Sequence, residues 1–379
     1  MKVQRLLFMV AISVALFSCG NGNTYNNGDW VSRAPYGGYP RGEAVAFSIG
    51  DTGYVGTGFG SNSTYFGDFW GFNPITGLWT QEASLPGLPR ALAIGFATTK
   101  YGYCGTGVYG VPGSTVGLDF LSDFWRYDPT SGTWDSMPAV PFGTGYGRDQ
   151  ATAWSVPDQG IGGLLGGADP LYPAYNDIYT FTESTNTWTK GTAPVDPVRG
   201  GLSFTHTSPI THQEVVYFVT GMGNTALIDK FWAWTPSTSS NASAWQQNNF
   251  AQGGIGPRRI ANVTDQSYDA GYHIVRQNAV AFQMNNNGVP KAYVSLGTNG
   301  SNLNDCWEYD FATDTWTPKT PYPPGQARAF AIALTLRDSG YVGLGTNAGI
   351  NAGSTSNFFS DFTQFYPNLP YNVDDYSNN

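Results

Sequence analysis

The sequence is poor in the residues on which most metal and catalytic sites depend. It has 3 cysteines and 3 histidines in 379 residues, with no CxxC pair or Cys/His cluster, so we predict no metal and no cofactor. Charged residues make up 12% of the chain and the net charge is -9. An acidic chain with so few cations disfavours a nucleic-acid partner.

Helical periodicity and catalytic motifs are scarce as well. No stretch in the body of the chain repeats apolar residues every three or four positions, so we expect no long helix there. No Gly-x-Ser-x-Gly elbow, phosphate-binding loop or close pair of carboxylates stands out. His206, His212 and His273 are scattered along the chain. The sequence therefore favours an all-β protein and weighs against an enzyme.

Glycine, proline and aromatic residues are abundant instead. The chain has 49 glycines, 24 prolines and 15% aromatic residues, a composition that suits many short strands joined by turns. Its length exceeds the size at which a single hydrophobic core usually stops growing. A multidomain or modular architecture is therefore expected.

One segment is written several times. "GDFWGFNPITGLWT" at 67–80 returns as "SDFWRYDPTSGTWD" at 122, "NDIYTFTESTNTWT" at 176 and "NDCWEYDFATDTWT" at 304, with a looser copy near Trp234 and Trp245. Each copy follows a glycine-rich stop such as "YVGTG" or "YCGTG", and an arginine opens the apolar run before that stop. These six arginines are Arg41, Arg90, Arg148, Arg199, Arg276 and Arg328.

A repeat of about 50 residues with four short strand signals predicts one propeller blade per copy. The paired glycines, and the aromatic residue separated from a tryptophan by six residues, resemble the kelch repeat over residues 28–367. The last copy lacks its tryptophan, whereas Trp30 precedes Arg41 by the spacing that separates Trp79 from Arg90. We therefore expect an all-β, six-bladed kelch-type β-propeller whose last blade is closed by the N-terminal strand carrying Trp30.

The N-terminus reads as an export signal. Lys2 and Arg5 precede a short apolar run, and "LFSC" at 16–19 resembles a bacterial lipobox whose cysteine is acylated. We expect a lipoprotein signal peptide over 1–18, lipidation at Cys19, a polar tether over 19–27 and a polar tail over 368–379. The location would be the cell envelope, as an outer-membrane lipoprotein facing either side. An ordinary secretory signal is the alternative. Cys104 and Cys306 read as buried, unpaired thiols.

The connections before the first strand and between the second and third strands should share one face of the disc. These loops vary most in length, and binding sites tend to lie on such loops. The six arginines fall on this loop-rich face, where they favour either an anionic ligand or structural pairs with aspartates that open the third strands. Those aspartates are Asp68, Asp123, Asp177, Asp305 and Asp361, with Asp229 beside Lys230.

Residues 246–275 form an insert on the same face. It supplies Arg258, Arg259, Tyr268, Tyr272 and His273, which read either as a recognition element or lid or as an idle surface loop. Four loop tyrosines, Tyr65, Tyr109, Tyr172 and Tyr175, could stack on sugar rings. Glu43 is the one glutamate expected near the channel entrance, where proton transfer to a sugar is conceivable.

Three functions fit these observations. The first is a membrane-anchored, non-catalytic propeller that binds a glycan or an envelope protein through the arginine-lined face. The second is a sugar-processing enzyme of the sialic acid mutarotase type, a secreted six-bladed propeller that this chain resembles at the level of fold. The third is a structural component of an envelope complex. A galactose oxidase-type copper enzyme is disfavoured, because the histidines and cysteines are poorly placed for it.

Overall fold

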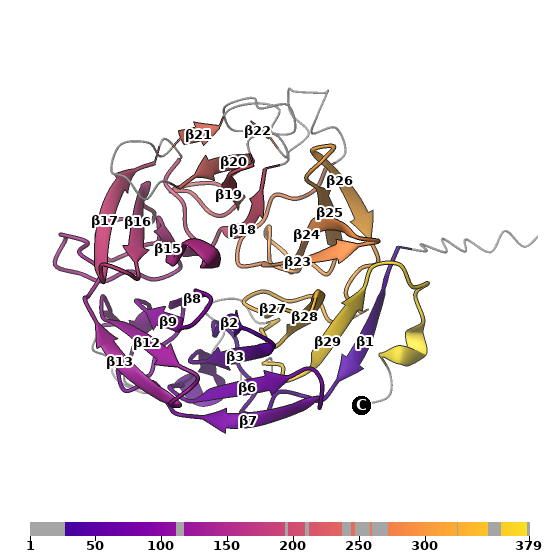
Figure 1. The fold of residues 1–379 in the computed structure, drawn as a ribbon, viewed down its shortest axis with the longest axis horizontal. Helices are drawn as coiled ribbons and strands as arrows, with labels where there is room; N and C mark the ends of the chain where they lie inside the picture. The colour runs from indigo at the N-terminus through magenta and orange to yellow at the C-terminus, as the bar shows by residue number, and fades with distance from the viewer. Residues whose placement is uncertain are drawn as a thin grey trace, which may run out of the picture.

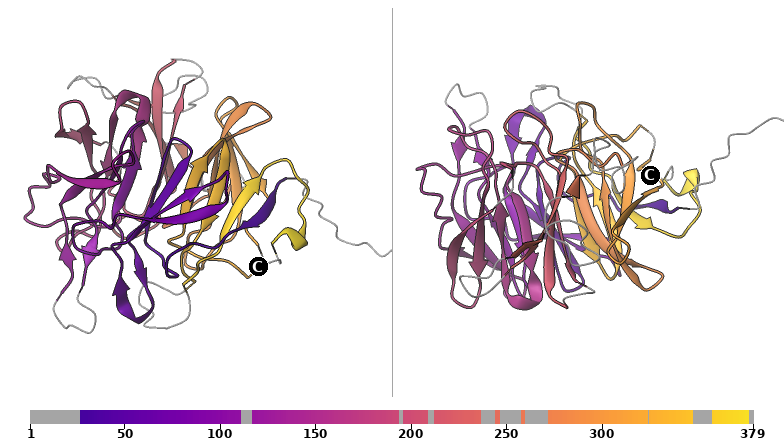
Figure 2. Two further views of the ribbon diagram at one scale, coloured as in Figure 1. Left: turned by 60° about the horizontal axis from the view of Figure 1, so that its bottom comes forward. Right: turned by 90° about the horizontal axis from the view of Figure 1, so that it is seen from above.

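Six antiparallel sheets stand around a central axis in the computed structural model, each forming one blade of a β-propeller (Figure 1). The structure describes residues 27–110, 117–193, 196–208, 212–236, 244–246, 258–259, 272–323, 325–347 and 358–376. The first strand of each blade lies nearest the axis and the fourth lies at the rim. The side views show the sheets standing across a thick disc (Figure 2).

The blades follow one another in chain order. Blade one contains β2 (Val45–Ile49), β3 (Thr52–Gly56), β6 (Phe69–Asn73) and β7 (Leu78–Glu82); blade two contains β8 (Ile94–Ala97), β9 (Gly102–Gly105), β12 (Phe124–Asp128) and β13 (Thr133–Met137); blade three contains β14 (Thr152–Val156), β15 (Ile161–Leu165), β16 (Asp177–Thr182) and β17 (Thr187–Thr192).

The second half of the ring repeats this plan. Blade four contains β18 (Leu202–Thr207), β19 (Glu214–Val219), β20 (Lys230–Thr235), β21 (Ala244–Gln246) and β22 (Arg258–Arg259); blade five contains β23 (Val280–Asn286), β24 (Val289–Ser295), β25 (Cys306–Asp310) and β26 (Thr315–Lys319); blade six contains β27 (Ile332–Leu336), β28 (Ser339–Gly343), β29 (Phe362–Tyr366) and β1 (Asp29–Arg33).

The predicted closure of the ring is confirmed. The N-terminal strand β1 pairs antiparallel with β29 from Asp29↔Tyr366 to Arg33↔Phe362, and Figure 1 shows β1 and β29 side by side in blade six. Trp30 is fully buried and its indole N–H donates to the carbonyl of Thr320 in blade five, at 3.0 Å. Cys104 and Cys306 are buried and free, as predicted.

Apolar side chains are buried mainly between neighbouring blades. One cluster joins Val55 and Phe72 of blade one to Leu334, Tyr341 and Phe362 of blade six, and comparable clusters join the other neighbours. Three more fourth-strand tryptophans donate their indole N–H to the preceding blade, namely Trp79 to Ala34, Trp134 to Ala83 and Trp188 to Pro138. The repeated tryptophan thus fastens one blade to the next, as its size and single donor suggest.

The structure defines two boundaries that the repeat leaves open. The first strands begin four residues after the arginine in blades one, two and three, because a residue with positive φ interrupts the extended backbone between the arginine and the strand. Part of the polar C-terminal segment, up to Tyr376, packs on the propeller. A 3-10 turn, η4 (Val373–Asp375), lies against β1, and the Tyr376 hydroxyl donates to Asp361 at 3.0 Å.

A few short elements lie in the loops of the loop-rich face and in the turn between β14 and β15. They are the two-residue pairs β4 (Phe59–Gly60) with β5 (Thr64–Tyr65) and β10 (Val108–Tyr109) with β11 (Asp119–Phe120), and the 3-10 turns η1 (Ser61–Ser63) and η2 (Pro157–Gln159). The first pair forms a small hairpin above blade one, and it carries part of the site described below.

Candidate site at the channel mouth

Five of the six predicted arginines form buried ion pairs with an aspartate of the same blade. In each pair both Nη atoms contact the carboxylate at 2.5–3.0 Å; the pairs are Arg41–Asp68, Arg90–Asp123, Arg148–Asp177, Arg276–Asp305 and Arg328–Asp361. These arginines are at most 1% exposed. Their Nη1 atoms also donate to a backbone carbonyl near the end of the second strand. The Nη atoms of these five guanidinium groups are therefore occupied by protein partners.

The aspartate of the pair explains the repeated "DFW". The indole N–H groups of Trp70 and Trp125 donate to Asp68 and Asp123 at 2.9 and 2.7 Å, and Trp307 donates to Asp305 in the same way. Burial works against ionisation of Asp68 and Asp123, but the hydrogen bonds and charge of the arginines outweigh it and hold both pKa values below their usual range.

Blade four departs from this arrangement at both positions of the pair. The backbone carbonyls of Arg90 and Arg148 accept from the glycines Gly58 and Gly107, and in blade four the equivalent acceptor is the carbonyl of Val198. Lys230 takes the place of the aspartate. Its backbone carbonyl accepts from the N–H at the end of the second strand, as the backbone carbonyls of Asp68 and Asp123 do in blades one and two. Lys230 pairs with Asp196 instead, at 2.5 Å.

Arg199 therefore lies one residue beyond the position predicted for it. Its backbone bridge to Met222 corresponds to the bridge between Asp149 and Ala168 in blade three. The expectation of six equivalent arginines is wrong for this blade, since an arginine one residue out of register cannot reach the third strand as the others do. Its Nε atom is buried without a hydrogen-bond partner among the described residues.

A ring of backbone hydrogen bonds surrounds the axis at this level. The N–H of one residue per blade donates to the carbonyl of its counterpart in the preceding blade, at 2.7–3.1 Å, and the sixth bond closes the circle; the members are Glu43, Leu92, Gln150, Gly200, Asn278 and Phe330. All six have φ between 50° and 60°. This left-handed conformation is unfavourable for residues other than glycine and persists where the surroundings fix it. On the far side of the ring, the first strands line a cavity of about 320 Å³.

Unpartnered polar groups gather on one half of the ring, in blades three to five. The buried atoms without a hydrogen-bond partner among the described residues include Asp149 Oδ1, Gln150 Oε1, Arg199 Nε and Asn278 Nδ2, which belong to the ring residues or their direct neighbours. These four atoms comprise two acceptors and two donors. Buried polar groups in folded proteins normally have partners, so a ligand with both donors and acceptors fits this half of the mouth.

Two carboxyl groups at the mouth have raised pKa values. Burial raises the pKa of Glu43 to about 7, and the negative charge of Asp149 adds to the effect. Burial raises the pKa of Asp149 to about 6, although the Arg199 guanidinium counteracts part of this rise. Carboxyls that take up and release protons near neutral pH are suited to hydrogen-bonding a ligand in either protonation state and to proton transfer.

Aromatic rings occupy the other half, in blades six, one and two. Phe59 contacts Phe358 and Tyr65, with ring centroids 6.0 and 5.0 Å apart, and Tyr65 contacts Tyr109 at 5.5 Å. These four rings are partly exposed. Phe59 pairs through its backbone with Gly42, directly before Glu43. Two of the four predicted loop tyrosines thus form part of a row at the mouth.

The other two predicted tyrosines meet in the loop of blade three. Tyr172 and Tyr175 have ring centroids 5.2 Å apart. The Tyr175 hydroxyl donates to Asp169 at 2.6 Å, and its ring lies 3.6 Å from the Arg148 guanidinium carbon. Asp169 also accepts the backbone N–H groups of Leu171 and Tyr172. This loop is therefore fixed to the structural ion pair of its own blade.

The insert 246–275 is described only in part. The backbone of Arg258 and Arg259 forms β22, which pairs with the start of β20 on the outer edge of blade four. Tyr272 contacts Trp307, and His273 is exposed while its carbonyl accepts from Arg276 at 2.8 Å. Tyr268 and Cys19 lie outside the described residues.

Among the described residues, no three His, Cys, Asp or Glu side chains gather as a metal site would require. No helix within those residues is long and apolar enough to cross a membrane.

The sheet order and closure define a six-bladed β-propeller. No protein-family model and no curated protein matches the sequence, so the kelch resemblance stays a prediction. Among the solved structures, 568 chains match this fold. The fold alone therefore does not indicate one particular function.

One solved protein with a similar fold is YjhT. Its structure aligns with a TM-score of 0.62 and 14% sequence identity, over 86% of this chain and 95% of YjhT. At this identity the likeness concerns the fold alone.

Proposed function

We propose that this chain is a membrane-anchored binding propeller of the cell envelope that takes a saccharide at the mouth of its central channel. The observation that carries the proposal is the two-sided character of the mouth. Aromatic rings from Phe59 to Tyr109 lie on one half, and unpartnered donors and acceptors at Asp149, Gln150, Arg199 and Asn278 lie on the other.

A sugar ring matches both halves. Its C–H faces are apolar enough to stack on aromatic rings, while its hydroxyl groups both donate and accept hydrogen bonds. Ligand sites generally combine an apolar lining with a few placed polar groups. An envelope protein partner, the other candidate of the sequence analysis, would not require small unpartnered groups recessed at the centre of the face.

The test is a binding screen with the purified protein. Neutral monosaccharides, uronic acids and sialic acid are titrated while the thermal unfolding midpoint is followed. A sugar at a hundred times its dissociation constant should stabilise the protein by about 2.7 kcal/mol. We expect this shift to disappear in Asp149→Asn and Arg199→Gln, each of which removes one charged group of the mouth. Binding that both variants retain, or a screen without any shift, would contradict the proposal.

A sugar-processing enzyme of the sialic acid mutarotase type is the second candidate. The observation that favours it is the Glu43 carboxyl, whose pKa burial raises to about 7 beside Asp149 at the mouth. An enzyme would speed the interconversion of sialic acid anomers, followed by NMR, and Glu43→Gln would abolish the acceleration. A pure binding protein would leave the rate unchanged.

The membrane anchor rests on the "LFSC" sequence. Cys19 is proposed to carry the lipid, with the propeller held outside the cytoplasm. In the native host, Cys19→Ser should move the protein from the membrane fraction to the soluble fraction. Mass spectrometry of the N-terminal peptide checks the modification directly, and an unmodified Cys19 would contradict it.

A further inference from the structure

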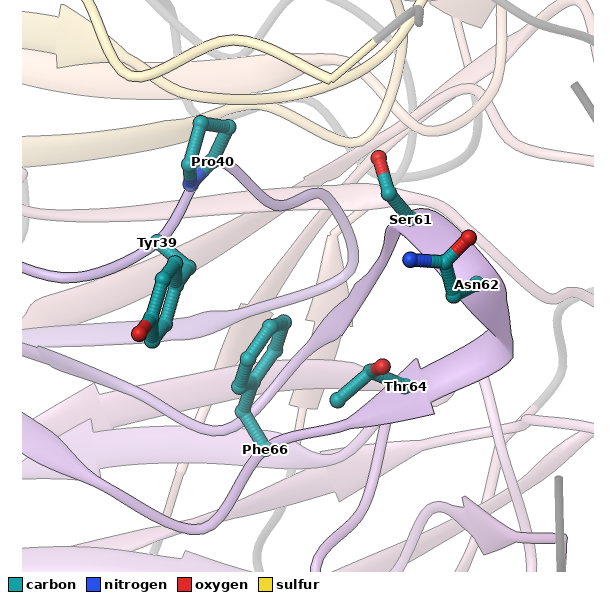
Figure 3. Close-up of a pocket in the computed structure, with 6 residues that line it drawn as sticks. All are labelled: Tyr39, Pro40, Ser61, Asn62, Thr64 and Phe66. Carbon is teal, nitrogen blue, oxygen red and sulfur yellow. The ribbon is translucent and has the colours of Figure 1, made fainter. Parts of the chain in front are cut away.

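A separate pocket lies between the segment that leads into blade one and the hairpin of that blade (Figure 3). It has a volume of about 340 Å³ and is lined by Tyr39, Pro40, Ser61, Asn62, Thr64 and Phe66. Two segments build it, namely the connection that leads from β1 into blade one and the hairpin of β4, η1 and β5. None of the groups discussed for the channel mouth lines this pocket.

Two aromatic rings form one side of the pocket. Tyr39 is 74% exposed, which is unusual for a side chain of this size. Its ring lies nearly parallel to that of Phe66, with an interplanar angle of 15° and centroids 6.2 Å apart. The guanidinium carbon of Arg41 lies 3.8 Å from the Phe66 ring centroid, and Arg41 is itself held by Asp68. The buried ion pair of blade one therefore fixes the position of this aromatic platform.

Uncharged polar side chains form the opposite side. The side chains of Asn62 and Thr64 have no hydrogen-bond partner among the described residues, and Figure 3 shows the Asn62 amide directed toward the space between the two sides. Asn62 has a φ of 59°, a conformation that asparagine tolerates better than most residues. Its carboxamide can both donate and accept a hydrogen bond, and the Thr64 hydroxyl can do the same.

The chemistry of this lining selects a neutral, hydroxylated ring. An exposed aromatic face offers stacking and the facing amide and hydroxyl offer hydrogen bonds, while none of the six lining side chains is charged at neutral pH. A phosphate, a carboxylate or a cationic ligand would meet no counter-charge within the pocket. An uncharged sugar residue is the class of ligand that uses every part of the lining.

The hairpin also connects the pocket to the channel mouth. Successive side chains of a strand point to opposite sides. Tyr65 contacts Phe59 and Tyr109 at the mouth, whereas its neighbours Thr64 and Phe66 line the pocket. The two regions are thus opposite sides of one hairpin, close enough for a single extended ligand to contact both.

We infer that the Tyr39–Phe66 pocket is a second saccharide subsite, which binds a neutral sugar residue of an oligosaccharide whose other end occupies the channel mouth. This inference rests on the saccharide-binding function proposed above and narrows it to oligosaccharides. Tyr39 supplies the stacking face, and Asn62 and Thr64 supply the hydrogen bonds.

Calorimetric titration of the full protein with matched monomers and trimers tests the inference. The probes are glucose and N-acetylglucosamine, with maltotriose, cellotriose and chitotriose as trimers. We expect at least one trimer to bind about 10-fold or more tightly than its monomer. Tyr39→Ala and Asn62→Ala should each remove most of that advantage. Tyr39→Phe, which keeps the ring, should retain it.

The outcomes separate the two proposals. Trimer binding that depends on Asp149 but is unaffected by Tyr39→Ala overturns the pocket and leaves the mouth site standing. Trimer binding lost in Tyr39→Ala but intact in Asp149→Asn overturns the mouth and the bridging ligand together. Binding of none of the trimers overturns the inference, whichever monosaccharide binds. Because Tyr39 is largely exposed, its variants should fold normally, which an unchanged melting temperature verifies.

Discussion

At the residue scale, the recurring unit of this protein is a charged pair placed where solvent is almost excluded. An arginine with almost no exposed surface is tolerable only when its charge is paired and most of its donors have partners. In blades one and two, three groups supply those partners: the aspartate, one backbone carbonyl near the end of the second strand, and the carbonyl two residues before the arginine. The pair thereby ties three separate segments of a blade together at the loop-rich face.

Breaking one such pair should be costly. Asp177→Asn leaves the Arg148 guanidinium, 1% exposed, without a carboxylate, and the free energy of unfolding should fall by about 3–5 kcal/mol. Asp135→Asn is the matched control, since the Arg126–Asp135 pair is exposed and should contribute less than about 1 kcal/mol. Chemical denaturation measures both. Equal losses in the two variants would mean that burial does not set the strength of these pairs.

Glu43 gives the stability a specific pH dependence. Its pKa is about 7 in the folded protein against an ordinary value of 4.5, so the folded state binds the proton more tightly. The contribution to stability is full below about pH 4.5 and is lost as the pH rises to about 7. Wild type should therefore lose about 1–3 kcal/mol across this window relative to Glu43→Gln. Parallel pH profiles of the two proteins in denaturant titrations would show that Glu43 is not buried as described.

At the element scale, one strand from the N-terminus completes the last blade. β1 supplies five residue pairs to β29, and Trp30 packs on Tyr322 and Phe365 with centroid distances of 4.9 and 4.6 Å. Without β1 the unpaired edge of β29 would be available to other chains. The strand therefore stabilises the ring and protects it from association.

Trp30→Ala should show this contribution directly. Removing a fully buried tryptophan costs about 3–5 kcal/mol, and here the indole N–H bond to Thr320 is lost as well. Leu78→Ala serves as the control, because Leu78 lies on the corresponding outer strand of blade one but is 64% exposed. Denaturant midpoints provide the comparison. A midpoint for Trp30→Ala as high as that of Leu78→Ala would contradict the closure by β1.

Elements were predictable from the sequence where the repeat is strict. The spacing of Trp30 to Arg41 predicted the closing strand, because a circular repeat must supply every strand somewhere in the chain. In blade four the predicted position of the arginine was wrong by one residue. Val198 holds the position that an arginine holds in the other blades, and Arg199 directly follows it, so the sequence pattern looks the same. The register became clear only through the backbone bonds of Val198 and Lys230, which side-chain identity alone does not reveal.

At the scale of the whole molecule, the departures from symmetry indicate where function lies. In five blades the arginine forms a structural ion pair with an aspartate. Blade four lacks both members of this pair, and its Arg199 lies at the mouth beside blade three. The residue after the arginine position is Gly42, Ala91 and Ala329 in three blades but Asp149 in blade three. A comparison of repeats at that position could have found Asp149 from the sequence.

The remainder of the site could not be found in this way. Gln150 and Asn278 belong to the mouth because a ring of backbone bonds assembles them there from separate blades. These two side chains have buried atoms without hydrogen-bond partners because of how the blades pack. No sequence pattern indicates this packing. The Tyr39–Phe66 pocket likewise depends on a loop and a hairpin whose approach to each other is set by the Arg41–Asp68 pair.

The most direct test of the account is the sugar affinity of wild type compared with Arg199→Gln, with Arg126→Gln as the control for loss of a charge. Arg126 is partly exposed and pairs with Asp135 on blade two, away from the mouth. Titration calorimetry with the best-binding saccharide of the screen should show at least about a tenfold loss for Arg199→Gln and none for Arg126→Gln. Equal affinities of wild type and Arg199→Gln would contradict a saccharide site at the channel mouth.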